Sequence, residues 1–197
     1  DVSLITDMSS LFHGKTTFND DISSWDVSSV TNMFFMFNSA TSFNQVISGW
    51  DVSNVTNMPY MFENAEAFNI NISAWDVSSV TNMHAMFNGA SDFNQDIGSW
   101  DVSSVTSMHS MFLKAYSFNQ DLNDWNVSNV TSMYAMFQNA SSFNQDLSSW
   151  DVSSVTNLNQ FGTMFQGANA LSDLNKCAIH TSFSDQNDLW SYDWSDL

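Results

Sequence analysis

The chain repeats itself every 25 residues, and this periodicity constrains its fold more than any local motif. A tryptophan marks each interval, within the pattern W-D/N-V-S-x-V-T, and a second block, M-F-x-x-A-x-x-F-N, lies between the tryptophans. The Trp column consists of Trp25, Trp50, Trp75, Trp100, Trp125 and Trp150. A fixed period of roughly 20 to 50 residues is typical of solenoids, in which each copy forms one coil that stacks on the next.

The copies divide the chain into three parts. Residues 1–17 match the back part of a copy, and six tandem copies occupy residues 18–170. The last copy carries three extra residues, Phe161-Gly162-Thr163, after Leu158. Residues 171–197 do not match the repeat. Because a solenoid must cover its last apolar layer, this segment is predicted to be a C-terminal cap, with a docking peptide for another protein as the alternative.

Apolar spacing within one copy indicates the path of a coil. Ile22, Trp25 and Val27 have the L-x-x-L-x-L spacing of a leucine-rich repeat, in which a short strand lines one face. Beyond Val27 most apolar residues are three positions apart, which favours tight 3₁₀-like turns. The predicted fold is a mainly β or irregular solenoid. It is a leucine-rich-repeat-like stack of about seven 25-residue coils, each with one short parallel strand, and a C-terminal cap.

Repeated side chains predict the interior of the stack. The Trp column, two columns of phenylalanine and two of methionine are expected to face inward, because each aromatic ring can bury about 150 to 250 Å². A further column of asparagine is expected to bond the backbone of its own turn and of neighbouring coils. This Asn column consists of Asn19, Asn44, Asn69, Asn94, Asn119 and Asn144.

Charge excludes some partners. The formal net charge is -18, from 21 acidic residues against three lysines, and arginine is absent. Binding to nucleic acid needs clustered cations, so the sequence predicts no nucleic-acid partner, and the same charge disfavours anionic membrane surfaces. No apolar run approaches the roughly 20 residues that cross a bilayer, so no membrane insertion is expected. Cys177 is the only cysteine and cannot form an internal disulfide.

The repeat resembles a known family. Its pattern, F-N-Q-D-I/L-x-x-W-D/N-V-S-x-V-T-x-M-x-x-M-F-x-x-A, is similar to that of the BspA-like leucine-rich-repeat surface proteins, and the resemblance covers most of the chain. It implies a secreted or cell-surface repeat domain, extracellular in location, that serves adhesion or partner binding. It implies no catalytic residues, because the family motif contains none.

Enzymatic chemistry is not expected from the residues themselves. No serine has a histidine and an aspartate at a recognisable spacing, and there is no glycine-rich phosphate loop. His84 and His109 occupy equivalent positions in adjacent copies, where two imidazoles could share a metal ion. Other copies carry Phe34, Pro59, Tyr134 and Asn159 in that position, which favours a variable surface site instead.

Two outward columns of hydroxyl groups are the candidate ligand-binding residues. The Ser column is Ser28, Ser53, Ser78, Ser103, Ser128 and Ser153, and the Thr column is Thr31, Thr56, Thr81, Thr106, Thr131 and Thr156. We expect a recognition or adhesion module that binds a protein or a glycan through these columns. The alternatives are an ice-binding protein with a repetitive Thr/Ser array, and a structural spacer or filament built by end-to-end self-association. Local hydrogen bonding to the backbone would explain the same residues without a ligand.

A column of carboxylates makes calcium the one metal to consider, and no other cofactor is expected. The Asp column consists of Asp26, Asp51, Asp76, Asp101 and Asp151, and it is interrupted by Asn126. Stacked carboxylates repel one another, and a hard cation that bridges their oxygens would relieve the repulsion. The alternative is that each aspartate bonds the backbone of its own turn.

Overall fold

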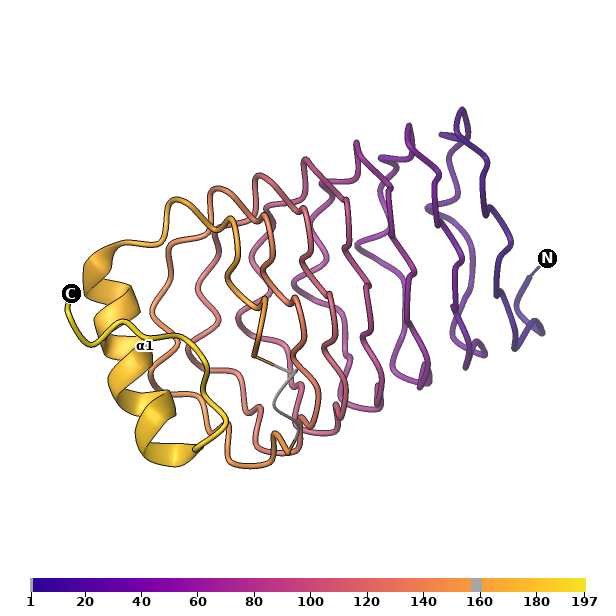
Figure 1. Cartoon of the computed structure of the whole chain (residues 1–197). Coiled ribbons are helices and arrows are strands. Elements are labelled where there is room, and N and C mark those ends of the chain that lie inside the picture. Colours follow the sequence, from indigo (N-terminus) through magenta and orange to yellow (C-terminus); the bar gives the residue numbers. More distant parts are fainter. Residues whose placement is uncertain (1, 157–160) are drawn as a thin grey trace.

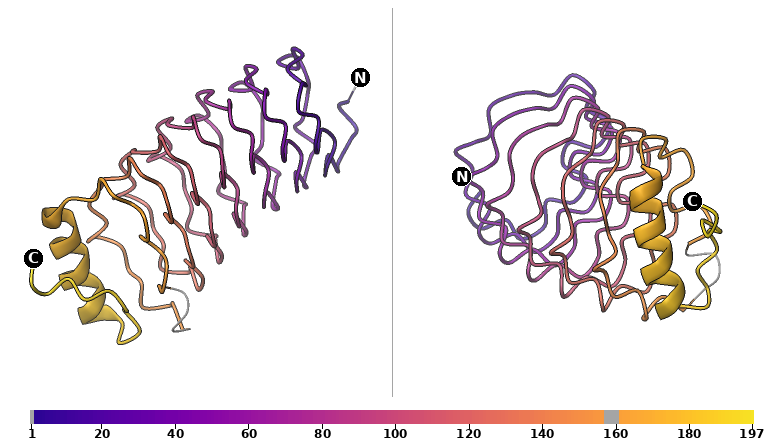
Figure 2. Two further views of the ribbon diagram at one scale, coloured as in Figure 1. Left: turned by 45° about the horizontal axis from the view of Figure 1, so that its top comes forward. Right: turned by 90° about the vertical axis from the view of Figure 1, so that its left-hand side faces the viewer.

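The computed structural model describes residues 2–156 and 161–197, so Asp1, Leu158 and Asn159 lie outside the described residues. Before residue 172 the chain winds into coils that follow one another along a single axis (Figure 1). Helix α1 (Asp173–Gln186) lies across the C-terminal end of this stack, and the N-terminus lies at the opposite end (Figures 1 and 2).

The expected strand in each coil is wrong. In the segment predicted as a strand, the N–H of Trp25 donates to the carbonyl of Ile22 at 3.1 Å, and just after it the N–H of Val30 donates to the carbonyl of Val27 at 2.9 Å. These tight turns use the backbone N–H groups within the coil, so those N–H groups cannot pair with a neighbouring coil. Here a side chain joins the coils instead: the indole N–H of Trp50 donates to the carbonyl of Ile22 at 3.3 Å.

Backbone bonds between coils are made mainly by alternate residues of the next segment. The N–H groups of Met33, Phe35 and Phe37 donate to carbonyls of the following coil at 2.9–3.2 Å, whereas that of Met36 donates to Met33 in its own coil. Phe35 and Ser39 have left-handed φ angles of 57° and 59°. This alternation interrupts extended backbone, so the described residues form a stack of irregular coils rather than a leucine-rich-repeat-like β solenoid. The parallel pairing consists of isolated bridges, Asp7–Asn32, Asn32–Asn57, Asn57–Asn82, Asn82–Ser107 and Ser107–Ser132.

Aromatic ladders fill the interior. Phe62 and Phe68 stack within one coil at 3.9 Å between ring centroids, and Phe62 stacks on Phe87 of the next coil at 5.7 Å. Trp50 and its counterparts up to Trp150 are buried, as predicted, with 4 % exposure or less. Trp25, in the first coil, is only partly buried. Stacked rings thus run from coil to coil through the apolar core, beside the columns of Val and Met.

The Asn column joins adjacent coils, as predicted. The side-chain oxygen of Asn94 accepts the backbone N–H of Asn119 at 2.9 Å, and equivalent bonds run from Asn19 to Asn144. The last bond in this series is donated by the N–H of Ser172, at 2.9 Å from Asn144. Ser172 is also the N-cap of α1, so the helix begins where the ladder ends.

Candidate functional site

The Ser and Asp columns bond to each other. The amide and the hydroxyl of Ser28 both donate to one oxygen of Asp26, at 3.1 and 2.6 Å. The same pair of bonds joins Ser78 to Asp76, while the structure gives Ser103 its amide bond to Asp101. The remaining copies repeat the arrangement, with Asp51–Ser53, Asn126–Ser128 and Asp151–Ser153. Each serine hydroxyl with such a bond has its hydrogen engaged within its own turn, which leaves oxygen lone pairs for a partner.

These local bonds stabilise exposed carboxylates without a cation. Side-chain and then backbone donation from Ser28 lowers the pKa of Asp26, and Ser78 lowers the pKa of Asp76 in the same way. Within residues 2–156 and 161–197, no group of three or more His, Cys, Asp or Glu side chains could hold a metal ion. The Asp column thus forms a row of separate Asx turns.

The Thr column runs along an exposed edge of the stack. The hydroxyl of Thr106 donates to the carbonyl of Thr81 at 3.2 Å, and the backbone N–H of Thr106 donates to the same oxygen at 2.9 Å. The hydroxyls of Thr31, Thr56 and Thr131 repeat this bond to the preceding coil at 3.2–3.4 Å. Thr156 is also exposed. Neighbouring threonines are thereby held in register, with their hydroxyl hydrogens directed to the backbone.

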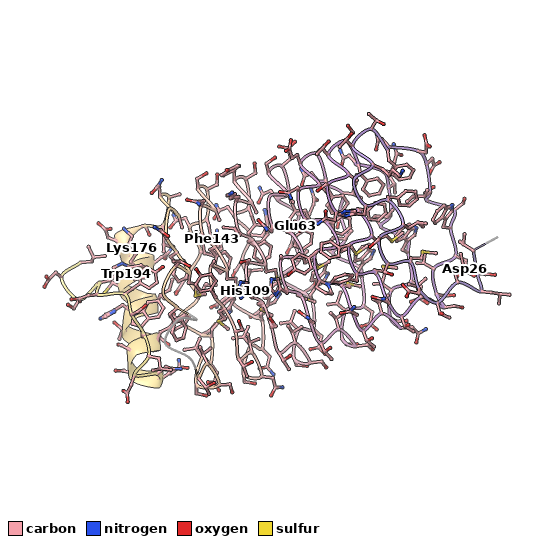
Figure 3. The ribbon with its side chains drawn as sticks, turned by 45° about the vertical axis from the view of Figure 1, so that its right-hand side comes forward. Asp26, Glu63, His109, Phe143, Lys176 and Trp194 are labelled. Carbon is pink, nitrogen blue, oxygen red and sulfur yellow. The ribbon has the colours of Figure 1, made fainter. Side chains whose placement is uncertain are left out.

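A second aromatic ladder, here called the ring strip, lies outside the core. It consists of Phe35, Tyr60, His84, His109 and Tyr134, all half-buried. Phe35 stacks on Tyr60 at 4.5 Å, His84 on His109 at 4.4 Å, and His109 lies 5.0 Å from Tyr134 between ring centroids. Tyr60 and His84 are also in contact, because the hydroxyl of Tyr60 is 3.0 Å from Nε2 of His84. Five rings from five successive coils therefore form one continuous contact (His109 is labelled in Figure 3).

Stacking in the ring strip disfavours a shared metal ion. The His84 and His109 rings are nearly parallel, at 13°, and a ring nitrogen donates its lone pair within the plane of the ring. Lone pairs of parallel rings do not converge on one ion. Burial lowers the pKa of both histidines, and the positive charge of His109 lowers that of His84 further. Neutral imidazole is accordingly the favoured form at neutral pH.

Glu63 (labelled in Figure 3) lies beside the ring strip, because its backbone N–H donates to the carbonyl of Tyr60 at 3.2 Å, and its carboxylate joins three coils. Its carboxylate accepts the side-chain amides of Asn38, at 2.6 Å, and of Asn88, at 2.8 Å. Burial raises the pKa of Glu63, and these two hydrogen bonds oppose that change. Burial and the nearby Glu63 charge raise the pKa of Tyr60. The carboxylate is thus a cross-coil hydrogen-bond acceptor.

Sequence reasoning treated the position that His84, His109 and Tyr134 share as variable surface and gave no role to Phe35 and Tyr60, so it missed the continuous ladder. The available signal was the residue type: five of the copies carry phenylalanine, tyrosine or histidine at positions where the repeat does not prescribe them. Sequence spacing alone does not place Tyr60 against His84, because the two residues occupy different positions in their copies and are 24 residues apart. The left-handed backbone at Tyr60, with φ of 59°, accompanies that contact.

The part of the chain that the structure describes holds no helix with the length and apolar character needed to cross a membrane.

Comparison with known proteins identifies a related family. The family described as "Mycoplasma protein of unknown function, DUF285" matches residues 1–81 and 68–177, which together span most of the chain. No match was found among curated proteins.

Proposed function

The chain belongs to the DUF285 family of Mycoplasma proteins of unknown function, and from this premise we propose that it is a non-enzymatic recognition or adhesion module. The finer resemblance of its repeat to BspA-like surface proteins supports a location outside the cell or on its surface. A net charge of -18 suits such a solvated surface domain.

The ring strip is the observation that carries this proposal. Core positions hold the same residues in nearly every coil, whereas the positions of the strip differ from coil to coil. Repeat proteins bind partners through side chains displayed at equivalent positions along one face. The Tyr60 hydroxyl and His84 are bonded to each other, so the strip offers a partner mainly the exposed parts of its rings, and aromatic side chains are favoured in protein interfaces.

The Ser, Thr and Asp columns have a smaller part in this proposal. Most of their hydroxyl hydrogens are bonded internally, as in Ser28 and Thr106. They offer a partner lone pairs and carboxylate charge, spread over many coils. Individual contacts of this kind are weak, so they would contribute mainly when a whole column is engaged.

Binding to arrays of extracellular-matrix proteins and glycans tests the proposal. A strip variant with Tyr60→Ser, His84→Ser and His109→Ser should lose most of the saturable binding while its circular dichroism spectrum stays unchanged. A matched variant with Ser53→Ala, Ser78→Ala and Ser103→Ala, which changes an outward column in the same three coils, should retain most of it. Absence of saturable binding by the unmodified chain to every array ligand would contradict the proposal.

Ice binding is a second candidate, and the Thr column favours it. Thr31, Thr56, Thr81, Thr106 and Thr131 are exposed and joined coil to coil by the hydroxyl bonds described above. A regular row of this kind can order water. Thermal hysteresis at micromolar protein, abolished by Thr81→Tyr with Thr106→Tyr, would support this function. An unmodified chain that neither shapes ice crystals nor lowers their growth temperature would eliminate it.

A further inference from the structure

A groove of about 380 Å³ crosses three coils, and its lining includes no residue of the ring strip. It is lined by Asn64, Glu66, Gly89, Ser91, Lys114 and Tyr116. The groove exists because Gly89 has no side chain where the adjacent coils carry Asn64 and Lys114. A Cβ atom at Gly89 would collide with the side-chain oxygen of Asn64, which lies over that residue. Gly89 also has a φ of +69°, so other residues would be strained there.

The groove is lined by side chains of opposite charge and by neutral polar groups. Among the described residues, the ammonium of Lys114 forms no ion pair, and the Glu66 carboxylate and the Tyr116 hydroxyl form no hydrogen bond. The hydroxyl of Ser91 donates to the backbone carbonyl of Glu66 at 3.2 Å, which holds that edge of the groove. The site therefore has an available cationic donor, an available anionic acceptor and the side-chain amide of Asn64.

Tyr116 gives the groove an aromatic side. Equivalent positions in other coils hold Thr41, Glu66, Ser91 and Ser141, so only this coil has a ring there among the described copies. Tyr116 is 47 % exposed, one of the few large apolar side chains left open to solvent. The face of an aromatic ring is electron-rich and packs favourably against polarised C–H groups.

We infer that this groove binds a pyranose unit of a neutral glycan. The C–H face of the sugar would pack on Tyr116, adjacent hydroxyls would donate to Glu66, and Lys114 and Asn64 would donate to sugar oxygens. A volume of about 380 Å³ suits one sugar unit, and a groove that is open to solvent admits a longer chain. The net charge of -18 and the Glu66 carboxylate disfavour acidic glycans. This inference rests on the proposed recognition function, to which it assigns a ligand class.

Titration of the ¹⁵N-labelled chain with the methyl pyranosides of glucose, galactose, mannose and N-acetylglucosamine tests the inference. At least one should shift the backbone amide signals of Gly89, Lys114 and Tyr116 in a saturable manner. Tyr116→Ala should weaken this binding by about tenfold, because it removes the stacking surface. Tyr116→Phe should retain it, and Glu66→Gln should weaken it less than Tyr116→Ala. Thr41→Ala, at the position equivalent to Tyr116 in the coil just before the groove, is the matched control and should have no effect.

The outcomes separate this inference from the proposed function. If no pyranoside shifts these signals, or if Tyr116→Ala leaves the affinity unchanged, the groove is not a sugar site. Binding of heparin in place of every neutral pyranoside would equally overturn the inference. A chain that then still binds matrix proteins through the ring strip remains a recognition module, whereas a chain that binds neither contradicts both proposals.

Discussion

The two ends of the stack carry equivalent residues in different surroundings. In the first coil, Phe12, Phe18 and Trp25 are only partly buried, and Leu4 nearby is 89 % exposed. At the other end, Trp150 has 0 % exposure. Figure 2 shows the reason, because α1 and the segment after it lie across the last coil, while none of the described residues covers the first coil in the same way. A coil thus does not bury its own aromatic rings, since much of their burial comes from the neighbouring layer.

Hydrogen bonds at the two ends of the stack show the same difference between a covered coil and an open one. Gln186 accepts the N–H of Val152 and donates to the carbonyl of Trp150, at 2.9 and 3.0 Å. Asn187, at the end of α1, donates to the carbonyls of Val152 and Val155 at 2.8 and 2.9 Å. At the first coil, within the described residues, the indole N–H of Trp25 donates to no carbonyl, unlike that of Trp50. Amide side chains from α1 therefore provide hydrogen bonds that another coil would otherwise provide.

The largest expected effect comes from removing a ring in the middle of the stack. Trp100→Ala should reduce the free energy of unfolding by about 3–5 kcal/mol, because it leaves a cavity and removes the indole bond to Ile72. Trp25→Ala, the matched change in the open first coil, should cost clearly less. Chemical denaturation of both variants measures the difference. Equal losses would show that the neighbouring coil contributes little to burial.

A smaller effect is expected at the covered end. Asn187→Ala should lower the free energy of unfolding by about 1–3 kcal/mol, because two buried carbonyls lose their donor. Asp185→Ala, at an exposed position on the same helix, is the control and should be nearly neutral. Thermal melting followed by circular dichroism distinguishes them. If both variants melt with the unmodified chain, hydrogen bonds from α1 do not stabilise the last coil.

The ring strip should make the middle coils sensitive to pH. The pKa of His84 and of His109 is lowered from 6.5 in the folded chain, so the unfolded chain binds more protons between the folded and unfolded values. Stability is then fully present above pH 6.5 and falls as the pH drops through that value toward the folded pKa. A variant with His84→Phe and His109→Phe should lose this dependence. Glu63 also titrates, but it is present in both chains, so its effect drops out of the difference between their stability–pH curves. If the two curves have the same shape, the pH dependence does not come from His84 and His109.

The smallest effect on stability is expected at the Asp column. Changing Asp51, Asp76 and Asp101 together to Asn should leave the melting temperature nearly unchanged at neutral pH, because an Asn oxygen can accept the same turn bond, as Asn126 does from Ser128. Binding to a cationic partner should weaken on the arrays. Unfolding of the triple variant would show that these carboxylates are structural.

Several features could be predicted from the sequence because they depend on repetition alone. The stacking period, the inward Trp column and the bonds of Asn94 and its counterparts follow from identical residues at identical intervals. The strand predicted at Ile22–Val27 is wrong, because spacing does not reveal whether a backbone N–H bonds within a turn or to another coil. The ring strip was missed because its rings come from two positions of the copy.

The sequence by itself determined the period, the identity of the core columns and the excess of negative charge, since each is a property of residue order or composition. Only the tertiary structure decided which donors close turns, where backbone adopts left-handed φ, and that Tyr116 and Lys114 share a groove over Gly89. The physical reason is that hydrogen bonds and contacts between coils join residues about 25 positions apart. Their geometry depends on how the coils stack, which no local pattern encodes.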